Sequence, residues 1–218
     1  MNNIPQMTKT QRYVKLSLQL ILAIGLVSSI VATNWINVLF IIFIIILSAF
    51  PTVFAKHYKI ILPTEFELAA ILFIFGSLFL GSSVGFYNRF WWWDILLHCI
   101  SAVLLGIVGL LLVWILNHNE KIEMSLNPLF ICFFSFSFAV AIGALWEIYE
   151  FTIDSFFGAN MQKSGLVDTM WDLIIDVTGA FIVSTSAYLY YKTGYKSQPI
   201  KKIQEFLSLN KTFFHNNK

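Results

Sequence analysis

Long apolar stretches alternate with short polar segments along most of the chain. About 20 apolar residues in a helix are enough to cross the ~30 Å hydrocarbon core of a bilayer. Only a few residues separate the first two stretches, so we expect those two to form an antiparallel hairpin. The pattern predicts six transmembrane helices, over residues 14–33, 35–55, 65–80, 94–116, 129–153 and 169–191.

The polar segments predict how the chain is organised outside these helices. A basic lead-in before the first stretch resembles a signal peptide, but the apolar run is too long and no small-x-small cleavage site follows it. We therefore expect a six-helix transmembrane domain over residues 1–192 and a basic tail over residues 193–218. Within the tail, residues 199–209 are expected to be partly helical and to lie on an anionic leaflet, with partner binding as the alternative.

Composition excludes a soluble domain. The chain is 58% hydrophobic and 12% charged, whereas about 25% of the residues in soluble domains are charged. The fold class is therefore an all-α polytopic membrane protein. Its expected partner is the lipid bilayer, and we expect no nucleic-acid partner.

Basic residues are unevenly divided between the two sides that six spans define. Of the fourteen Lys and Arg residues, only Arg89 and Lys163 lie on the side of the 154–168 loop. Basic residues are enriched in cytoplasmic segments of membrane proteins. The distribution therefore predicts that both termini are cytoplasmic and that the 154–168 loop lies outside.

Seven of the chain's twelve acidic residues gather at the predicted outer end of the last three spans. Ionisable groups at membrane depth cost roughly 2.5–3.5 kcal/mol each on insertion scales, so this carboxylate cluster needs compensation. At about 100° per residue, helical spacing gives each span one polar stripe. The stripes are Asp94 with His98, then Glu147, Glu150 and Asp154, and finally Asp168, Asp172 and Asp176.

Two explanations of the carboxylate cluster stay open. Carboxylates near the N-termini of spans 94–116 and 169–191 can cap free amide groups. Those of span 129–153 lie at a helix C-terminus, where the helix dipole is unfavourable and capping does not explain them. Because only two basic residues lie on this side, either a divalent cation balances the charge or the carboxylates are protonated or solvated.

If a cation binds, its expected ligands are mainly hard oxygen atoms, which favour Mg²⁺, Mn²⁺ or Ca²⁺, with Zn²⁺ or Fe²⁺ possible through the histidine. The expected metal ligands are Asp94, His98, Glu147, Asp172 and Asp176. Glu150 lies closer to the water interface than Glu147 and is the expected general base. The residues expected to contact a substrate are Arg89, Lys163, Asp154 and Asp168.

A sequence pattern recurs in the spans that carry the carboxylate cluster. Residues 93–102 and 171–180 share the pattern Trp-Asp-x3-[His/Asp]-x2-[Ser/Gly]-Ala. This predicts that the third and fourth helices repeat as the fifth and sixth, in parallel orientation about an axis along the membrane normal.

These motifs, with Gly85-Phe86-Tyr87 and Trp146-Glu147-x2-Glu150, resemble the YjdF-like bacterial inner-membrane proteins over roughly residues 60–190. The pair Asp94-x3-His98 alone is also similar to VanZ-like proteins. The YjdF-like family has no assigned activity. The resemblance therefore implies a multi-pass protein of a bacterial inner membrane and a role for the polar positions, but no reaction.

Three classes of function fit this sequence. We favour a divalent-cation-dependent hydrolase or transferase acting on a lipid head group or envelope precursor, because the carboxylate cluster lies near one face, whereas transporter sites usually lie near the midplane. A cation- or proton-coupled small-solute transporter is the first alternative. A non-catalytic membrane partner with a structural cation site is the second. No phosphate loop, zinc helix or serine nucleophile motif competes with these hypotheses.

Overall fold

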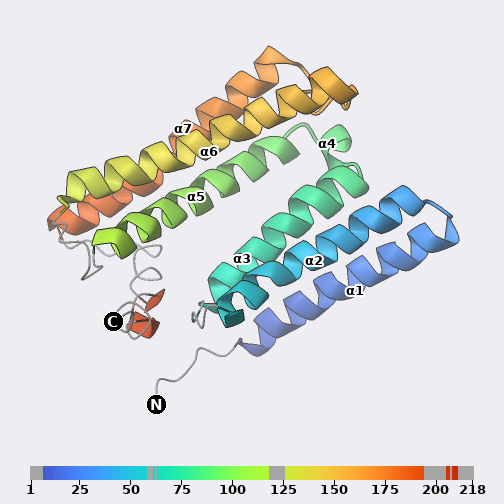
Figure 1. Ribbon diagram of the computed structural model, residues 1–218, viewed down its shortest axis with the longest axis horizontal. Coiled ribbons are helices and arrows are strands. Elements are labelled where there is room, and N and C mark those ends of the chain that lie inside the picture. Colours follow the sequence, from blue (N-terminus) through green and yellow to red (C-terminus); the bar gives the residue numbers. More distant parts are fainter. Residues whose placement is uncertain are drawn as a thin grey trace. The chain divides into compact units, whose positions relative to one another are not determined.

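A computed structural model describes residues 7–57, 61, 63–117, 126–193, 205–206 and 208–210, and this part of the chain contains helices and no strand. Its elements appear in Figure 1. They are α1 (Lys9–Val31), α2 (Trp35–His57), α3 (Thr64–Ile74), the π-helical segment η1 (Phe75–Ser83), α4 (Phe86–Arg89), α5 (Trp93–Asn117), α6 (Pro128–Phe157) and α7 (Leu166–Thr193).

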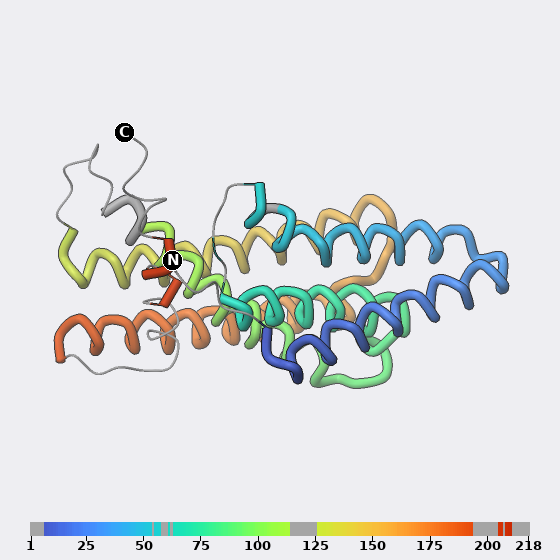
Figure 2. Tube along the Cα trace, turned by 90° about the horizontal axis from the view of Figure 1, so that it is seen from below, coloured from blue at the N-terminus to red at the C-terminus, as the bar shows by residue number. Residues whose placement is uncertain are grey.

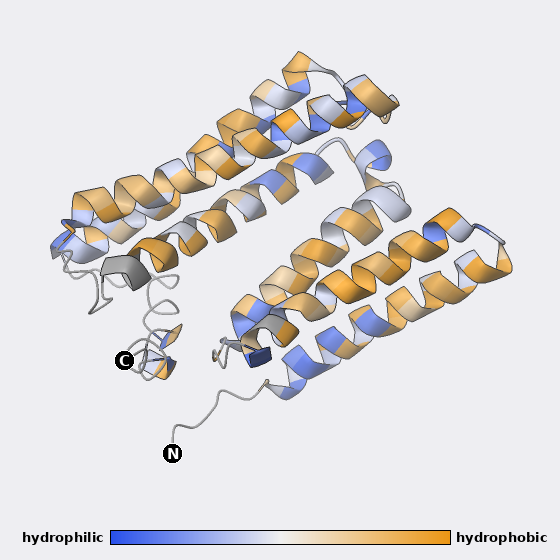
Figure 3. Ribbon diagram, in the orientation of Figure 1, coloured by the Kyte–Doolittle hydropathy of each residue, from blue (hydrophilic) through white to orange (hydrophobic). Residues whose placement is uncertain are grey.

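The predicted all-α membrane fold is confirmed, because each predicted span coincides with a helix of the structure. In the described part of the chain, five helices are long and apolar enough to cross a membrane: α1, α2, α3 continued by η1, α5 and α6. Hydrophobic residues make up most of the length of these helices in Figure 3. The sixth, α7, has 28 residues and is less apolar because it carries the third acidic stripe.

Two helices begin or end at residues other than those that the hydrophobic pattern predicts. α1 begins at Lys9, five residues before the predicted start, because Thr8 and Gln11 form a capping box: each side chain accepts a hydrogen bond from the other residue's backbone N–H. Such a box stabilises polar residues in the first helical turn. The third predicted span ends later than expected, because η1 continues α3 as far as Ser83.

The chain divides into two compact units, and the first comprises Met1–Trp93 and Glu205–Phe213. In it, α1 and α2 form the expected antiparallel hairpin and α3 with η1 packs against α2 (Figure 1). Gly25 of α1 lets the Phe79 ring approach, since a Cβ at this position would lie 2.9 Å from the ring. The core residues of this unit are Leu22, Ile41, Ile44, Phe75 and Phe79.

Part of the C-terminal tail also belongs to the first unit. The buried Asn210 side chain accepts a hydrogen bond from the Ile61 N–H at 2.6 Å and donates one to the Ile61 carbonyl at 2.8 Å. Within the segment expected to be partly helical, Glu205, Phe206, Ser208 and Leu209 are helical. The remaining residues of that segment lie outside the described part of the chain.

The second unit comprises Asp94–Gln204 and Phe214–Lys218 and contains α5, α6 and α7. α6 and α7 lie antiparallel and in contact (Figure 2). α5 packs against both at small residues: the Ser135 hydroxyl donates to the Gly106 carbonyl at 2.7 Å, and a Cβ at Gly179 would lie 2.7 Å from that of Ala102. Small residues are the usual means by which transmembrane helices approach closely.

Three predictions about the whole chain stay predictions. The proposed repeat compares helices of one unit with helices of the other. The cytoplasmic location of the termini and the division into a transmembrane domain and a tail both depend on a membrane. The structure describes the two units separately and contains no membrane.

Candidate functional site

The three acidic stripes meet inside the second unit. Figure 3 shows hydrophilic residues gathered at the ends of α5, α6 and α7 nearest the α6–α7 connection. Six of the predicted site residues are buried there, which is unusual for side chains of this type. They are Asp94, His98, Glu147, Glu150, Asp172 and Asp176.

Helix geometry places these side chains. Asp94 and His98 are four residues apart in the first two turns of α5, and residues with this spacing lie on the same face of a helix. Glu147 and Glu150 form the buried face of the last third of α6. α6 ends at Phe157, and the C-cap residue Gly158 adopts a left-handed conformation with φ of 63° that suits glycine.

His98 lies at the centre of the site, and its two ring nitrogens face different carboxylates. Its Nδ1 atom lies 3.2 Å from Asp176 Oδ1. Its Nε2 atom faces two other carboxylates, at 3.8 Å from Glu147 Oε1 and 4.0 Å from Asp94 Oδ1. A carboxylate on one ring nitrogen is how metal-binding histidines are commonly oriented, which leaves the other nitrogen for the metal.

Gly143 makes the position of Asp176 possible. A Cβ atom added at Gly143 would collide with the carboxylate of Asp176. Any side chain at position 143 would therefore push Asp176 away from its place beside His98.

Glu147 is the least satisfied group of the site. Its side chain is 4% exposed, and neither of its carboxylate oxygens has a hydrogen-bond partner among the described residues. The Oδ2 atom of Asp168 is in the same condition. Burying a carboxylate without a partner is costly, so such groups usually bind a cation or lose their charge.

Among the residues that the structure describes, two overlapping groups of side chains could hold a metal ion. One consists of His98, Glu147 and Asp172, the other of Asp94, Asp168 and Asp172, and within each group the possible ligand atoms lie within 4.8 Å of one another. Asp172 belongs to both groups. Asp168, which the sequence placed among the substrate contacts, is thus positioned as a possible ligand, whereas Asp176 lies beside His98 and belongs to neither group.

The connection between α6 and α7 brings a cation to the site. Lys163 Nζ lies 2.8 Å from Asp94 Oδ2. Asp154 holds this connection in place, because its two oxygens accept hydrogen bonds from the N–H groups of Met161 and Gln162 at 2.6 and 2.7 Å. Asp154 therefore has a local structural role that the sequence did not indicate, and its expected contact with a substrate stays a prediction.

The predicted general base, Glu150, and the predicted substrate contact, Arg89, lie in different units of the structure. Glu150 is buried like Glu147, although its spacing suggested a position nearer the interface. Arg89 is the last residue of α4 and belongs to the first unit, so its contact with a substrate also stays a prediction. Gln162 was not predicted at all: its amide donates to the Thr169 hydroxyl at 2.6 Å and joins the connection to α7.

Comparison with known proteins gives a family but no activity. A protein of Thermotoga maritima named "Uncharacterized protein" is 29% identical over 146 residues, which are 66% of this chain and 72% of that relative. No solved structure matches the chain. The family described as "Predicted membrane protein (DUF2238)" matches residues 14–193, which include every predicted span. Because this match covers most of its length, the chain belongs to the DUF2238 family of predicted membrane proteins.

Proposed function

We propose that the second unit binds a divalent cation between α5, α6 and α7 and is a cation-dependent hydrolase or transferase for a lipid head group or envelope precursor. The observation that carries this proposal is the buried Glu147 carboxylate. It has no hydrogen-bond partner among the described residues and forms a group of possible ligands with His98 and Asp172. A cation in this group would balance charges that are otherwise expensive at membrane depth.

The geometry supports a revised set of ligands. His98 Nε2, Glu147 and Asp172 form the set with the strongest support, and Asp94 with Asp168 extends it on the side of the α6–α7 connection. Asp176 then orients His98 instead of binding the cation. The carboxylates favour Mg²⁺, Mn²⁺ or Ca²⁺, and the imidazole makes Zn²⁺ or Fe²⁺ the alternatives.

The chain's own residues suggest how a reaction would proceed. A bound divalent cation supplies a water of lowered pKa and polarises a phosphoryl or carbonyl oxygen. Glu150, one helical turn from Glu147 on α6, is the proposed general base that accepts a proton from the attacking water. Lys163 already neutralises Asp94 and would pair with an anionic head group such as a phosphate.

The depth of the site supports chemistry near the membrane surface. Asp94 is the second residue of α5 and Asp168 the third of α7. At ~1.5 Å per residue, His98 and Asp172 lie only about one to two turns below the helix ends. Transporter sites, by contrast, usually lie near the midplane between broken helices.

One observation favours a second candidate. All six central side chains are buried, so little of the site is open to the surface of the protein. A closed set of carboxylates also suits a cation- or proton-coupled small-solute transporter, whose site opens to one side at a time. The resemblance to YjdF-like proteins, which the family match supports, assigns no reaction, and the similarity to VanZ-like proteins stays a proposal.

Element analysis of the purified full chain, before and after chelation, tests the cation site. We expect one divalent cation per chain, lost in Asp172→Asn and kept in Glu65→Gln, whose carboxylate belongs to the first unit. Glu150→Gln should keep the cation and lose lipid turnover or complementation. The cation site would be contradicted if the protein purified without metal and no divalent ion changed its melting temperature. That result would favour the transporter hypothesis.

If Glu150→Gln instead keeps full activity while bound cation falls, Glu150 is a ligand and the hydrolase mechanism above is wrong. A wild-type protein that binds the cation but turns over no lipid or envelope precursor, and that Glu150→Gln does not alter, would favour the structural cation site.

A further inference from the structure

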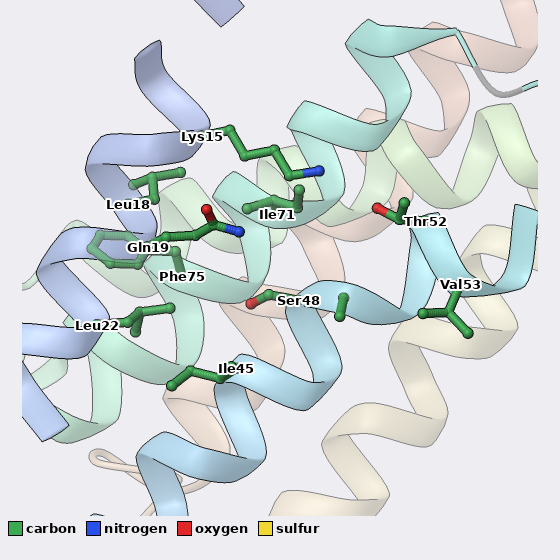
Figure 4. A pocket seen from close by; sticks show the side chains of 11 residues that line it. Lys15, Leu18, Gln19, Leu22, Ile45, Ser48, Thr52, Val53, Ile71 and Phe75 are labelled. Carbon is green, nitrogen blue, oxygen red and sulfur yellow. The ribbon is translucent and has the colours of Figure 1, made fainter. Parts of the chain in front are cut away.

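The first unit, which holds none of the carboxylate cluster, contains a groove of about 420 Å³ between α1, α2 and α3 with the start of η1. Figure 4 shows the side chains that line it. Most of its wall is apolar, as expected for a surface that lies against lipid chains. The apolar wall consists of Leu18, Leu22, Ile45, Val53, Ile71 and Phe75.

Polar groups from α1 and α2 also line this groove, and most of them already have partners. Lys15 Nζ lies 2.6 Å from Glu67 Oε1, and the Thr52 hydroxyl donates to the same oxygen at 2.6 Å. The Ser48 hydroxyl donates to the Ile44 carbonyl one turn earlier. Lys15 keeps further N–H donors, because an ammonium group has three.

Gln19 is the exception among these polar groups. It lies one turn beyond Lys15 in the transmembrane helix α1, and its amide extends toward α2 in Figure 4. Within the described part of the chain, no hydrogen bond to this amide is found. An amide in an apolar environment costs several kcal/mol unless it finds a partner. The groove therefore presents an amide group that suits a ligand with hydrogen-bond acceptors.

Charge indicates which ligand suits the groove. Lys9 and Arg12 are exposed on the first turns of α1, before Lys15, and Lys56 and His57 occupy the last turn of α2. At this end α3 contributes two carboxylates in its first turn, Glu65 and Glu67, and Glu67 pairs with Lys15, so the four Lys and Arg residues outnumber the acidic ones. The end of the groove at the start of α1 thus carries an excess of positive charge, which attracts anionic lipid head groups.

We propose that this groove binds one anionic glycerophospholipid from the leaflet at the start of α1. Its phosphate pairs with Lys15 and Arg12, an ester carbonyl accepts a hydrogen bond from the Gln19 amide, and one acyl chain lies along the apolar wall. This lipid is separate from any substrate of the carboxylate cluster, and the proposal does not depend on the proposed function.

Native mass spectrometry of the full chain in detergent tests the proposal, with added phosphatidylglycerol or phosphatidylcholine as the probe. We expect one phosphatidylglycerol per chain, bound at least about tenfold more tightly than phosphatidylcholine, because the basic residues at this end of the groove repel the trimethylammonium group of phosphatidylcholine. Lys15→Gln should remove this preference, while Lys192→Gln, which changes the net charge equally on α7, should keep it.

Two more variants separate the groove from general lipid contact. Ala49→Trp fills the groove from α2 and should abolish phosphatidylglycerol binding, whereas Leu39→Trp, on an exposed part of the same helix outside the groove lining, should not. Gln19→Leu should weaken binding about tenfold. If thermal melting shows that Ala49→Trp does not fold, phosphatidylglycerol binding by Gln19→Leu and Lys15→Gln tests the proposal instead.

Three outcomes would overturn the proposal. The first is equal binding of the two lipids by the wild-type chain. The second is unchanged phosphatidylglycerol binding in Gln19→Leu and Lys15→Gln, which would indicate only lipid surrounding the helices. The third is a dimer that Ala49→Trp dissociates, because the groove would then be covered by a second copy of the chain.

Discussion

Asp172 and Asp176 lie one helical turn apart on α7, yet their surroundings give them different roles. Asp176 contacts His98 Nδ1, whereas Asp172 belongs to both groups of possible ligands. Their spacing along one helix predicts that both face the carboxylate cluster. It does not predict which of them meets His98, because that depends on how α5 packs against α7. The sequence therefore named residues that the structure brings together, and the ligand role predicted for Asp176 stays a prediction beside its contact with His98.

This difference can be measured as a difference in cation affinity. Asp172→Asn removes a ligand, so we expect it to abolish binding. Asp176→Asn should weaken binding about 10- to 100-fold, because a histidine that loses its orienting carboxylate is a poorer ligand. Calorimetric titration of the chelated protein with Mn²⁺ measures both. Equal losses in the two variants would make Asp176 a ligand, as the sequence alone suggested.

Replacing Glu147 by glutamine should change the melting temperature in opposite directions with and without a bound cation. Without a cation, its buried carboxylate accepts no hydrogen bond and faces only His98 Nε2 at 3.8 Å, so Glu147→Gln should raise the melting temperature of the chelated protein. With saturating cation, the same variant should melt below the wild type, because it has lost a ligand. Thermal melting in chelator and in Mn²⁺ gives both values.

Glu67→Gln is the matched control for this test, because Glu67 already has Lys15 and Thr52 as partners. It should lower the melting temperature under both conditions by a similar amount. A Glu147→Gln variant that behaves like this control would show that Glu147 binds no cation.

At the scale of elements, the hydrophobic pattern located each long helix, because about 20 apolar residues are needed wherever a helix crosses lipid. It could not predict the faces on which the helices pack, since side chains facing lipid are as apolar as those facing a neighbouring helix. Only small or polar residues mark the packed faces, as Gly143 and Gly179 do here. Capping at Thr8 and the π-helical geometry of η1 depend on local hydrogen bonds that hydropathy does not contain.

The connection between α6 and α7 is expected to depend on Asp154. Asp154→Ala leaves the N–H groups of Met161 and Gln162 without their acceptor, which should cost about 1–3 kcal/mol of stability. Hydrogen exchange of these two amides should become faster. Thr152→Ala, which removes only a hydroxyl bonded within α6, should leave them protected. Unchanged exchange in Asp154→Ala would contradict the role assigned to this residue.

At the scale of the whole molecule, the uneven distribution of basic residues predicts the orientation in the membrane. In a background without the native thiols of Cys99 and Cys132, a cysteine at Asn160 should react with an impermeant maleimide in intact cells. A cysteine at Met7 should react only after the membrane is opened. The reverse pattern would place the carboxylate cluster on the cytoplasmic side and remove envelope precursors as substrates.

The acidic stripe of α7 also has a consequence for how the chain is made. α7 is not among the five helices apolar enough to cross a membrane by composition, and each of its three aspartates opposes insertion. It follows α5 and α6 in synthesis, so the groups that compensate its charges, His98 above all, are already in the bilayer when it leaves the ribosome. We therefore expect insertion of α7 to depend on α5 and α6 still lying beside it when it leaves the ribosome. A nascent chain in which they have diffused away would leave residues 166–193 outside the lipid, as a degradation signal for membrane proteases.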